Sequence, residues 1–274
     1  TMKNNYDRRN FIKPVIFGVS GKEITAKEQE LFHKHNPLGF IVFARNIDNP
    51  AQLKKLVGQL KATTFPRNDV LVMIDQEGGR VARLKPPHWP DMPSLASFRT
   101  EIEMESFNRI KRQVHNNYRL FAWELRKMGI NVNCAPVLDL RYDFADDIMG
   151  DRCFSGDTYE VSQIGKEICK GLLMGNCFPV IKHIPGHGRA VCDSHKELPI
   201  IKTSLDEMAA TDFVPFKELA DMPFAMTAHI KYTAIDPDEC ATNSEKVIYL
   251  IRKGIGFKGL LFSDDLTMKA LKGD

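Results

Sequence analysis

Residues 182–195 hold the densest group of reactive side chains in this sequence. Three histidines, a lysine and an aspartate stand out in the stretch: Lys182, His183, His187, Asp193 and His195. A carboxylate two residues from a histidine can orient the imidazole ring and raise its pKa. Asp193 and His195 therefore form a pair suited to moving a proton at cellular pH. The ordinary alternative is a solvated surface loop, although loops at strand ends often carry function.

Polar side chains also follow the other apolar runs that we interpret as strands. They are Arg45, Asn46, Asp75, Gln76, Glu77, Asp139, His229, Asp264 and Asp265. In barrels and in open α/β sheets alike, functional side chains lie at the carboxyl ends of parallel strands. A single carboxylate after a strand is more often a helix cap or a turn former. The repetition over five strands, rather than any one residue, indicates a site.

The neighbouring Asp264 and Asp265 support two interpretations at once. One aspartate could cap the helix that follows, because carboxylates suit the amino terminus of a helix. The other would then face the site, where a carboxylate can act as a nucleophile or stabilise a positive charge.

Seven short apolar runs predict the strands that must position these side chains. They lie at 14–20, 39–43, 70–75, 131–138, 178–182, 224–228 and 259–263. Helical patterns separate them, at 25–36, from 49 onward, at 100–129, 159–174, 205–219 and 243–253. This alternation predicts an α/β fold with a parallel sheet, either a TIM-like (β/α)8 barrel or a doubly wound open sheet. No G-x-G-x-x-G or Walker pattern follows the early strands, which weakens the nucleotide-binding version.

Local signals support several of these elements. Thr25 with Glu28, and Thr100 with Glu103, form capping-box patterns, and Pro50 stands at a first helical position. The chain has no break in composition and no linker, so we expect one domain over residues 1–274. If the fold is a barrel, its last βα unit is absent from the sequence, because only seven strands are visible.

The composition is that of a soluble globular protein, with 43% apolar residues, 27% charged residues and a net charge of +3. So balanced a charge gives no sign of a nucleic-acid partner. Six cysteines without a C-x-x-C pair predict reduced thiols and a cytoplasmic location. The polar amino terminus lacks a secretory signal, and no apolar run is long enough for a membrane span. We expect a monomer.

Four motifs, in order along the chain, resemble those of family 3 glycoside hydrolases of the NagZ type, which are β-N-acetylglucosaminidases. KHIPGHG at 182–188, followed by DSH at 193–195, is similar to the family signature. IDQEGGRVARL at 74–84 resembles the sugar-binding loop, GDRCF at 150–154 the short arginine motif, and GLLFSDDLTM at 259–268 the nucleophile segment.

The resemblance implies a TIM-like barrel and a retaining, two-step mechanism. Asp264 matches the nucleophile, and His195, with Asp193 as its partner, matches the general acid/base in place of the usual second carboxylate. The positions that match sugar-binding residues are Asp75, Arg83, Arg152, Lys182 and His183. His187 and His229 would lie in or near the pocket.

The resemblance also implies the substrate and the setting. The substrate would be N-acetylglucosaminyl-β-1,4-anhydro-N-acetylmuramic acid, a small carbohydrate that usually carries a peptide, in cytoplasmic peptidoglycan recycling. Gly186 and Gly188 would let the loop that carries His195 swing over the substrate. Neither a cofactor nor a metal is expected.

Three other readings remain open. His183, His187 and His195, with His229 and Asp264, could ligate a metal in an amidohydrolase-like barrel, although such barrels usually begin with an H-x-H after the first strand. A catalytically silent sugar-binding protein would need neither Asp264 nor the pair of Asp193 and His195. A phosphorylase would keep the mechanism and use phosphate in place of water.

Overall fold

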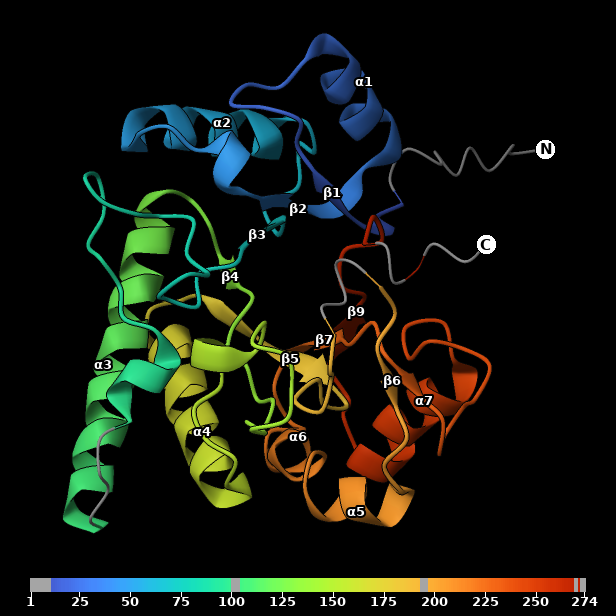
Figure 1. Cartoon of the computed structure of the whole chain (residues 1–274). Helices are drawn as coiled ribbons and strands as arrows, with labels where there is room; N and C mark the ends of the chain where they lie inside the picture. Colours follow the sequence, from blue (N-terminus) through green and yellow to red (C-terminus); the bar gives the residue numbers. More distant parts are fainter. Residues whose placement is uncertain (1–10, 100–103, 193–196, 269–270, 272–274) are drawn as a thin grey trace.

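Within the part of the chain that the structure describes, seven parallel strands form the central sheet (Figure 1). The computed structural model describes residues 11–99, 104–192, 197–268 and 271. In spatial order the strands are β1 (Lys13–Gly18), β2 (Pro37–Val42), β3 (Leu71–Ile74), β4 (Val132–Asn133), β5 (Phe178–Ile184), β7 (Phe224–Thr227) and β9 (Leu260–Phe262). Their spatial order follows the chain, and each neighbouring pair is parallel. The predicted α/β fold with a parallel sheet is confirmed.

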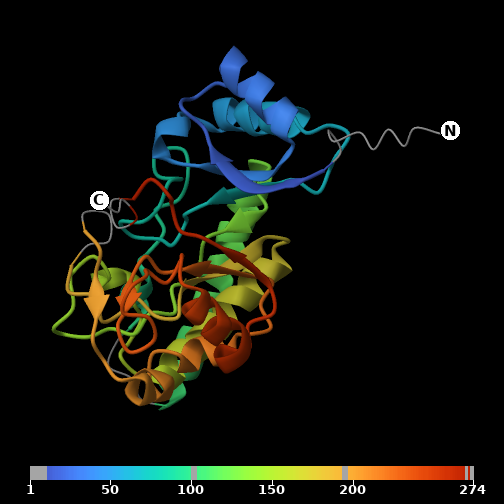
Figure 2. The same ribbon diagram turned by 90° about the vertical axis from the view of Figure 1, so that its right-hand side faces the viewer.

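The sheet curls, and its edge strands β1 and β9 turn toward each other in both ribbon views (Figure 1 and Figure 2). The curl gives the sheet an inner and an outer face, and both are mostly buried along the central strands, whereas the edge strands β1 and β9 are partly exposed. Successive residues of a strand point to opposite faces, so Leu71 and Met73 of β3 belong to an inner apolar cluster while Val72 and Ile74 pack into the outer core. Strands buried on both faces are apolar throughout, which explains the unbroken apolar runs of the sequence.

Four long helices cover the outer face of the first five strands (Figure 1). They are α1 (Ala26–His35), α2 (Pro50–Ala62), α3 (Met104–Lys127) and α4 (Thr158–Met174). The predicted capping box is confirmed, because the Thr25 side chain accepts a hydrogen bond from the N–H of Glu28 and the Glu28 side chain bonds back. Asn49 caps α2 ahead of Pro50. The predicted helix start at Thr100 and Glu103 lies outside the described residues.

The carboxyl-terminal helices differ from the prediction. In place of one helix over 205–219 the chain forms α5 (Leu205–Ala210) and α6 (Val214–Glu218). Pro215 explains the break, since proline has no N–H to donate and its ring clashes with the preceding turn of a continuous helix. The predicted helix over 243–253 is observed as α7 (Glu245–Tyr249), which continues as a π-helical turn, Leu250–Ile255.

Two further differences concern strands. A small parallel sheet of β6 (Ile200–Ile201) and β8 (Lys231–Tyr232) was not predicted, because two-residue strands carry no periodic pattern. The predicted strand over 131–138 is regular only at β4, since Pro136 cannot donate to the ladder. Its continuation returns to the sheet as an isolated bridge between Val137 and Lys182. Within the described residues, no helix combines the length and apolar character that crossing a lipid bilayer requires.

Candidate active site

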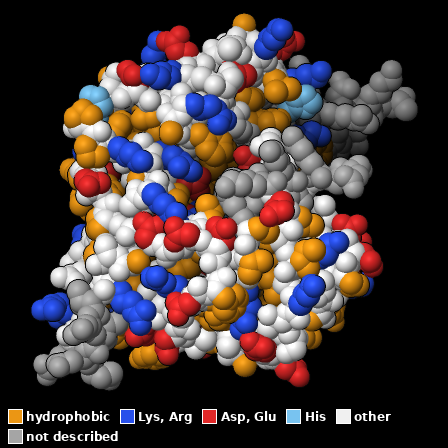
Figure 3. Space-filling view, in the orientation of Figure 1, with side chains coloured by type: hydrophobic (Ala, Val, Ile, Leu, Met, Phe, Trp, Pro, Cys, Tyr) orange, Lys and Arg blue, Asp and Glu red, His pale blue; other side chains and the backbone are white. Residues whose placement is uncertain are grey.

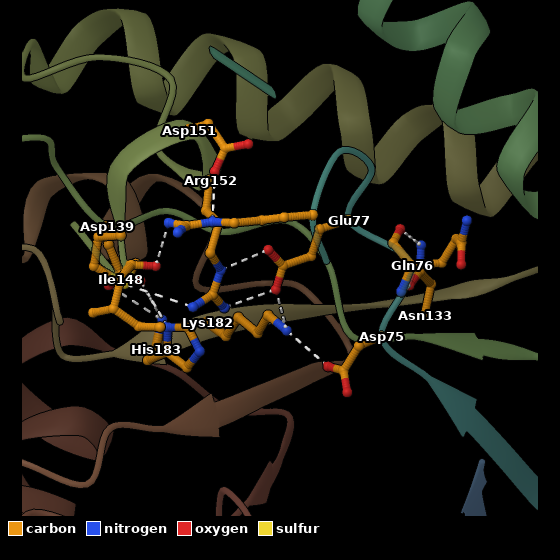
Figure 4. A network of polar contacts seen from close by, with 12 residues as sticks. Asp75, Gln76, Glu77, Asn133, Asp139, Ile148, Asp151, Arg152, Lys182 and His183 are labelled. Atoms are coloured by element: carbon orange, nitrogen blue, oxygen red, sulfur yellow. Dashed lines mark hydrogen bonds and ion pairs between the residues drawn. The ribbon is translucent and has the colours of Figure 1, made fainter. Parts of the chain in front are cut away.

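Charged side chains from distant parts of the chain meet at the carboxyl ends of β3 and β5 (Figure 4). Asp75 follows β3 directly, and Lys182 and His183 belong to the second half of β5. Arg152 comes from the short 3-10 helix η4 (Gly150–Arg152). On the face drawn in Figure 3, acidic and basic side chains are spread among apolar ones over the whole surface.

Lys182 is the centre of this network. Its Nζ lies 2.9 Å from Oδ1 of Asp75 and 2.7 Å from Oε1 of Glu77, and the residue is 2% exposed. Burial alone would lower the pKa of the Lys182 ammonium, but the two carboxylates outweigh it and hold the pKa above its usual value. Lys182 is therefore a fixed positive charge in the site.

Glu77 joins Lys182 to Arg152. Its carboxylate accepts hydrogen bonds from Nε and Nη2 of Arg152, both at 2.8 Å, in the two-pronged geometry that makes such pairs strong. Burial would raise the pKa of Glu77, but Arg152 and Lys182 hold it far below its usual range. Glu77 therefore stays ionised and fixes the side chains of both cations.

Asp75 has one cation on each carboxylate oxygen. Lys182 contacts Oδ1, and Nη2 of Arg83 lies 3.3 Å from Oδ2. Burial would raise the pKa of Asp75, but Lys182 and Arg83 lower it overall. The thiol of Cys134, by contrast, has a pKa well above its usual value because of burial and the nearby negative charge of Asp75, so it is unsuited to nucleophilic chemistry.

The turn after β3 places Asp75, Glu77 and Arg83 around this centre. The side chain of Gln76 accepts hydrogen bonds from the backbone N–H of Arg83 at 2.8 Å and of Leu84 at 3.0 Å, which folds the turn back on itself. Gly78 has φ +99°, and a Cβ there would clash with the carbonyl oxygen of Pro93. Only glycine satisfies both conditions without strain.

Asp139 organises the second half of the site. One of its oxygens lies 2.7 Å from Nδ1 of His183, and its carboxylate also accepts the backbone N–H groups of His183 at 3.2 Å and His187 at 2.6 Å. These donors and the charge of His183 outweigh burial and lower the pKa of Asp139. The carboxylate orients the His183 ring and anchors the loop that begins at His187.

His187 is buried and held in its neutral form. Burial lowers the pKa of its ring to about 4, and the neighbouring His183 adds to the effect. Asp264 follows β9 and so stands at the same carboxyl edge of the sheet as Asp75 and Lys182. Its charge opposes, without reversing, the lowering of the His187 pKa.

The two aspartates after β9 have different surroundings. Oδ1 of Asp265 accepts hydrogen bonds from the backbone N–H of Thr267 at 2.8 Å and from its hydroxyl at 2.7 Å, so Asp265 holds the turn that follows. Asp264 Oδ1 accepts the N–H of Asp265 at 2.8 Å. His229 Nε2 lies 3.1 Å from the carbonyl oxygen of Asp265 and ties this segment to the end of β7. Both side chains accept from backbone N–H groups, and Asp265 holds a turn rather than the cap of a described helix, so the division of the pair into a cap and a site residue stays a prediction.

The structure joins four of the residues predicted to bind a sugar, Asp75, Arg83, Arg152 and Lys182, in one network and pairs the fifth, His183, with Asp139. The predicted acid/base pair, Asp193 and His195, lies outside the described residues. Among those that are described, no group of three or more His, Cys, Asp or Glu side chains is placed to hold a metal ion.

Sequence reasoning placed Glu77 and Asp139 at strand ends but assigned them no role. The only feature of the sequence that pointed to these two residues was their position after a strand. Carboxylates are common at such positions, so the position alone did not indicate a role. Arg45, another strand-end residue, is structural: its Nε donates to the carbonyl oxygen of Val19 at 3.0 Å and its guanidinium stacks on Phe43.

Comparison with known proteins agrees with this geometry. The model of the glycosyl hydrolase family 3 N-terminal domain matches residues 12–273. A β-hexosaminidase of Methylobacillus flagellatus is 34% identical over 260 residues, which cover 93% of this chain and 72% of the relative. A β-hexosaminidase of Pseudomonas aeruginosa is 32% identical over 255 residues, 93% of this chain and 74% of the relative.

Solved structures give the same result. Native NagZ from Neisseria gonorrhoeae superposes with a TM-score of 0.86 at 33% identity, over 93% of this chain and 75% of that one. The complex of that NagZ with N-trifluoroacetyl-D-glucosamine gives a TM-score of 0.86 at 33% identity, over 93% of this chain and 74% of that one. The chain is thus a glycoside hydrolase and belongs to glycoside hydrolase family 3.

Proposed function

We propose that this chain is a retaining exo-β-N-acetylglucosaminidase. The observation that carries the proposal is the network of Asp75, Glu77, Arg83, Arg152 and Lys182 at the carboxyl ends of the strands, at the same edge of the sheet as Asp264. Charged groups make the stronger hydrogen bonds, so a set of fixed cations and carboxylates suits a sugar rich in hydroxyl groups. Similarity to β-hexosaminidases supports the same substrate class.

Sugar binding is assigned to Asp75, Arg83, Arg152, Lys182 and His183. Carboxylate oxygens accept from sugar hydroxyls, while the lysine and the arginines donate to their oxygens. The interlocked ion pairs hold these side chains before the substrate arrives, which reduces the entropy lost on binding.

The chemistry is assigned to Asp264 and to the pair of His195 and Asp193. In the first step a carboxylate oxygen of Asp264 attacks the anomeric carbon, while the His195 imidazolium gives its proton to the departing oxygen. In the second step neutral His195 takes a proton from water, whose oxygen attacks the same carbon and releases Asp264. Asp193 would hold the ring and stabilise its charged form.

The finer parts of the proposal follow from the family. The substrate would be N-acetylglucosaminyl-β-1,4-anhydro-N-acetylmuramic acid with or without its peptide, in the recycling of peptidoglycan in the cytoplasm. NagZ from Neisseria gonorrhoeae, whose complex contains N-trifluoroacetyl-D-glucosamine, supports recognition of the N-acyl group. We further propose that the seven parallel strands belong to a TIM-like (β/α)8 barrel, that the chain is one domain, and that it acts as a monomer without a cofactor.

Hydrolysis of an aryl N-acetyl-β-glucosaminide tests the assignment. We expect parent activity that a chelator does not change, with the β-anomer as first product. Asp264→Asn should lower kcat by at least about 10³-fold because it removes the nucleophile. Asp265→Asn is the matched control, since the neighbouring carboxylate serves the turn.

Other outcomes would favour the alternatives. Loss of activity with chelator would indicate a metal-dependent hydrolase. A glycosyl phosphate formed in phosphate buffer would indicate a phosphorylase. Binding of N-acetylglucosamine without turnover would indicate a sugar-binding protein, and equal losses in the Asp264 and Asp265 variants would contradict Asp264 as nucleophile.

A further inference from the structure

His229 connects the end of β7 to the segment that carries Asp264. It follows β7 closely in the chain and is 0% exposed. Its Nε2 lies 3.1 Å from the carbonyl oxygen of Asp265, and its Nδ1 lies 2.7 Å from Oγ1 of Thr242, which precedes α7. One imidazole ring thus joins the end of β7, the approach to α7 and the turn after β9.

The partners of His229 determine which ring nitrogen carries the proton. A carbonyl oxygen can only accept a hydrogen bond, so Nε2 must donate to Asp265. Both partners are neutral, and an ionised ring buried without a countercharge is costly, so the ring is neutral and Nδ1 accepts. The Thr242 hydroxyl therefore donates to Nδ1, and the Thr227 hydroxyl, 2.8 Å away, donates to Oγ1 of Thr242. A single chain of hydrogen bonds runs from Thr227 to the Asp265 backbone.

Thr242 is itself held in place by its neighbours. The N–H of Ala241 donates to the carbonyl oxygen of Ile230 at 2.8 Å, so the chain before α7 lies against the chain after β7. Ser244 caps α7 directly after this contact. Oγ1 of Thr242 also lies 3.3 Å from the carbonyl oxygen of Ala228, a longer contact than the one to Nδ1. The backbone around Thr242 is therefore fixed, and its hydroxyl orients the His229 ring.

Asp265 passes this constraint to Asp264. Its carbonyl oxygen accepts from His229, and its side chain accepts from the N–H and the hydroxyl of Thr267. Its own N–H donates to Oδ1 of Asp264 at 2.8 Å. Because Asp265 is held on two sides, the N–H that it offers to Asp264 has a fixed direction. This bond engages Oδ1 and leaves Oδ2 to form the bond to carbon.

We propose that His229, oriented by Thr242, is a positioning residue for the nucleophile, and that it holds Asp264 with Oδ2 directed at the anomeric carbon. The inference rests on the nucleophilic role proposed above for Asp264. A displacement of about 1 Å between reacting atoms can cost about 10²-fold in rate. In this assignment His229 touches no substrate and acts through the backbone of Asp265.

Azide rescue separates the positioning of Asp264 from general damage to the site. In Asp264→Gly, azide can attack the anomeric carbon of a dinitrophenyl N-acetyl-β-glucosaminide. A C–N bond forms, the C–O bond to the aglycone breaks, and dinitrophenolate leaves with the electron pair, so that the product is the α-glycosyl azide. This leaving group needs no proton, so the reaction reports on the attack alone.

The effect of His229→Leu should depend on whether the Asp264 carboxylate is present. In the parent we expect kcat/KM on the dinitrophenyl substrate to fall by about 10²-fold, while the Kd of N-acetylglucosamine changes by less than about 3-fold. In Asp264→Gly with azide, the same substitution should lower the rate by less than about 3-fold, because no carboxylate remains to be positioned. A purely structural defect would lower both rates by the same factor.

Substitutions at Thr242 test the chain of hydrogen bonds and leave the ring present. Thr242→Val removes the hydroxyl that donates to Nδ1 and should lower kcat/KM by about 10-fold, whereas Thr242→Ser restores a hydroxyl and should recover most of that loss. Thr63→Val is the matched control for loss of a buried hydroxyl. Thr63 is 7% exposed, and its hydroxyl donates to the carbonyl oxygen of Leu60 at 2.7 Å, at the end of α2. This control should keep kcat/KM within about 3-fold of the parent value.

The outcomes distinguish this inference from the proposed function. If azide rescues Asp264→Gly but His229→Leu costs the same factor in both backgrounds, or costs nothing in the parent, the positioning role is overturned while the proposed function stands. If Asp264→Gly keeps the parent activity or forms no glycosyl azide, the proposed function fails and this inference fails with it. Should His229→Leu not fold, the same comparison with Thr242→Val decides the question.

Discussion

Replacing Glu77 by glutamine removes one buried negative charge and keeps the size of the side chain. Glu77 is 4% exposed and accepts from Arg152 twice at 2.8 Å, with Lys182 at 2.7 Å. Glutamine offers one acceptor oxygen and turns an NH₂ group toward these donors. Removing one partner of a buried ion pair leaves the other charge without compensation, which costs about 3–5 kcal/mol. We therefore expect Glu77→Gln to lose at least about 3 kcal/mol of unfolding free energy.

Urea unfolding at pH 7 measures this loss, and Glu124→Gln is the matched control. Glu124 is also a glutamate with a mostly buried side chain, 8% exposed, but its partner Lys127 is 42% exposed and lies 3.2 Å away in the same helix. A pair open to solvent on one side contributes less than about 1 kcal/mol. We expect the two variants to differ by at least about 2 kcal/mol.

A double-mutant cycle tests the cause. In an Arg152→Met background there is no guanidinium to be left without its carboxylate partner. Glu77→Gln should therefore cost about 2 kcal/mol less unfolding free energy there than in the parent. The activity of Glu77→Gln should fall by at least about 10-fold in kcat/KM, since Lys182 and Arg152 lose their common anchor. Equal unfolding costs for Glu77→Gln and Glu124→Gln, or full additivity in the cycle, would refute the view that Glu77 holds both cations.

Three further predictions concern single contacts. Burial lowers the pKa of the His187 ring to about 4, so the folded protein holds this ring neutral. As the pH falls from 6.5 to 4, about 3 kcal/mol of unfolding free energy should therefore be lost. Urea unfolding of His187→Gln should show a flatter pH dependence, and equal slopes for parent and variant would contradict this. Asp139→Asn should cost about 2–3 kcal/mol and lower kcat/KM, since the carboxylate accepts from His183 and from two backbone N–H groups; an unchanged Tm would argue against it. Gly78→Ala should cost at least about 2 kcal/mol in thermal unfolding, because the residue has a positive φ and the new Cβ would clash with the carbonyl oxygen of Pro93. Gly58→Ala is the control and should cost nothing, because the space around its Cβ is open.

The regular part of the fold follows directly from local sequence. The central strands are apolar because both faces of the curled sheet are mostly buried there. The caps at Thr25 and Asn49 use signals within a single helical turn. Elements that depend on tertiary context were not predictable. Strands β6 and β8 exist only because each pairs with the other. The break between α5 and α6, in contrast, has a local signal in Pro215, which the prediction of a single helix overlooked.

For the site, the sequence indicated which residues take part but not which of them pair. Residue type and position after a strand indicated Asp75, Lys182 and their neighbours. The choice of partners did not follow, because Glu77 is 75 residues from Arg152 and Asp75 is 107 residues from Lys182 along the chain. Several carboxylates stood at strand ends, and only the folded turn after β3 decides which one receives the arginine.

Tyr232 fastens both ends of the excursion between β5 and β6. Its hydroxyl bonds to the carbonyl oxygen of Gly186, and its backbone pairs with Ile201 in the small sheet. Gly186 and Tyr232 stand 46 residues apart along the chain, so one side chain joins the segment after β5 to the small sheet. A change at this ring would therefore act on both the edge of the site and the pairing of β6 with β8.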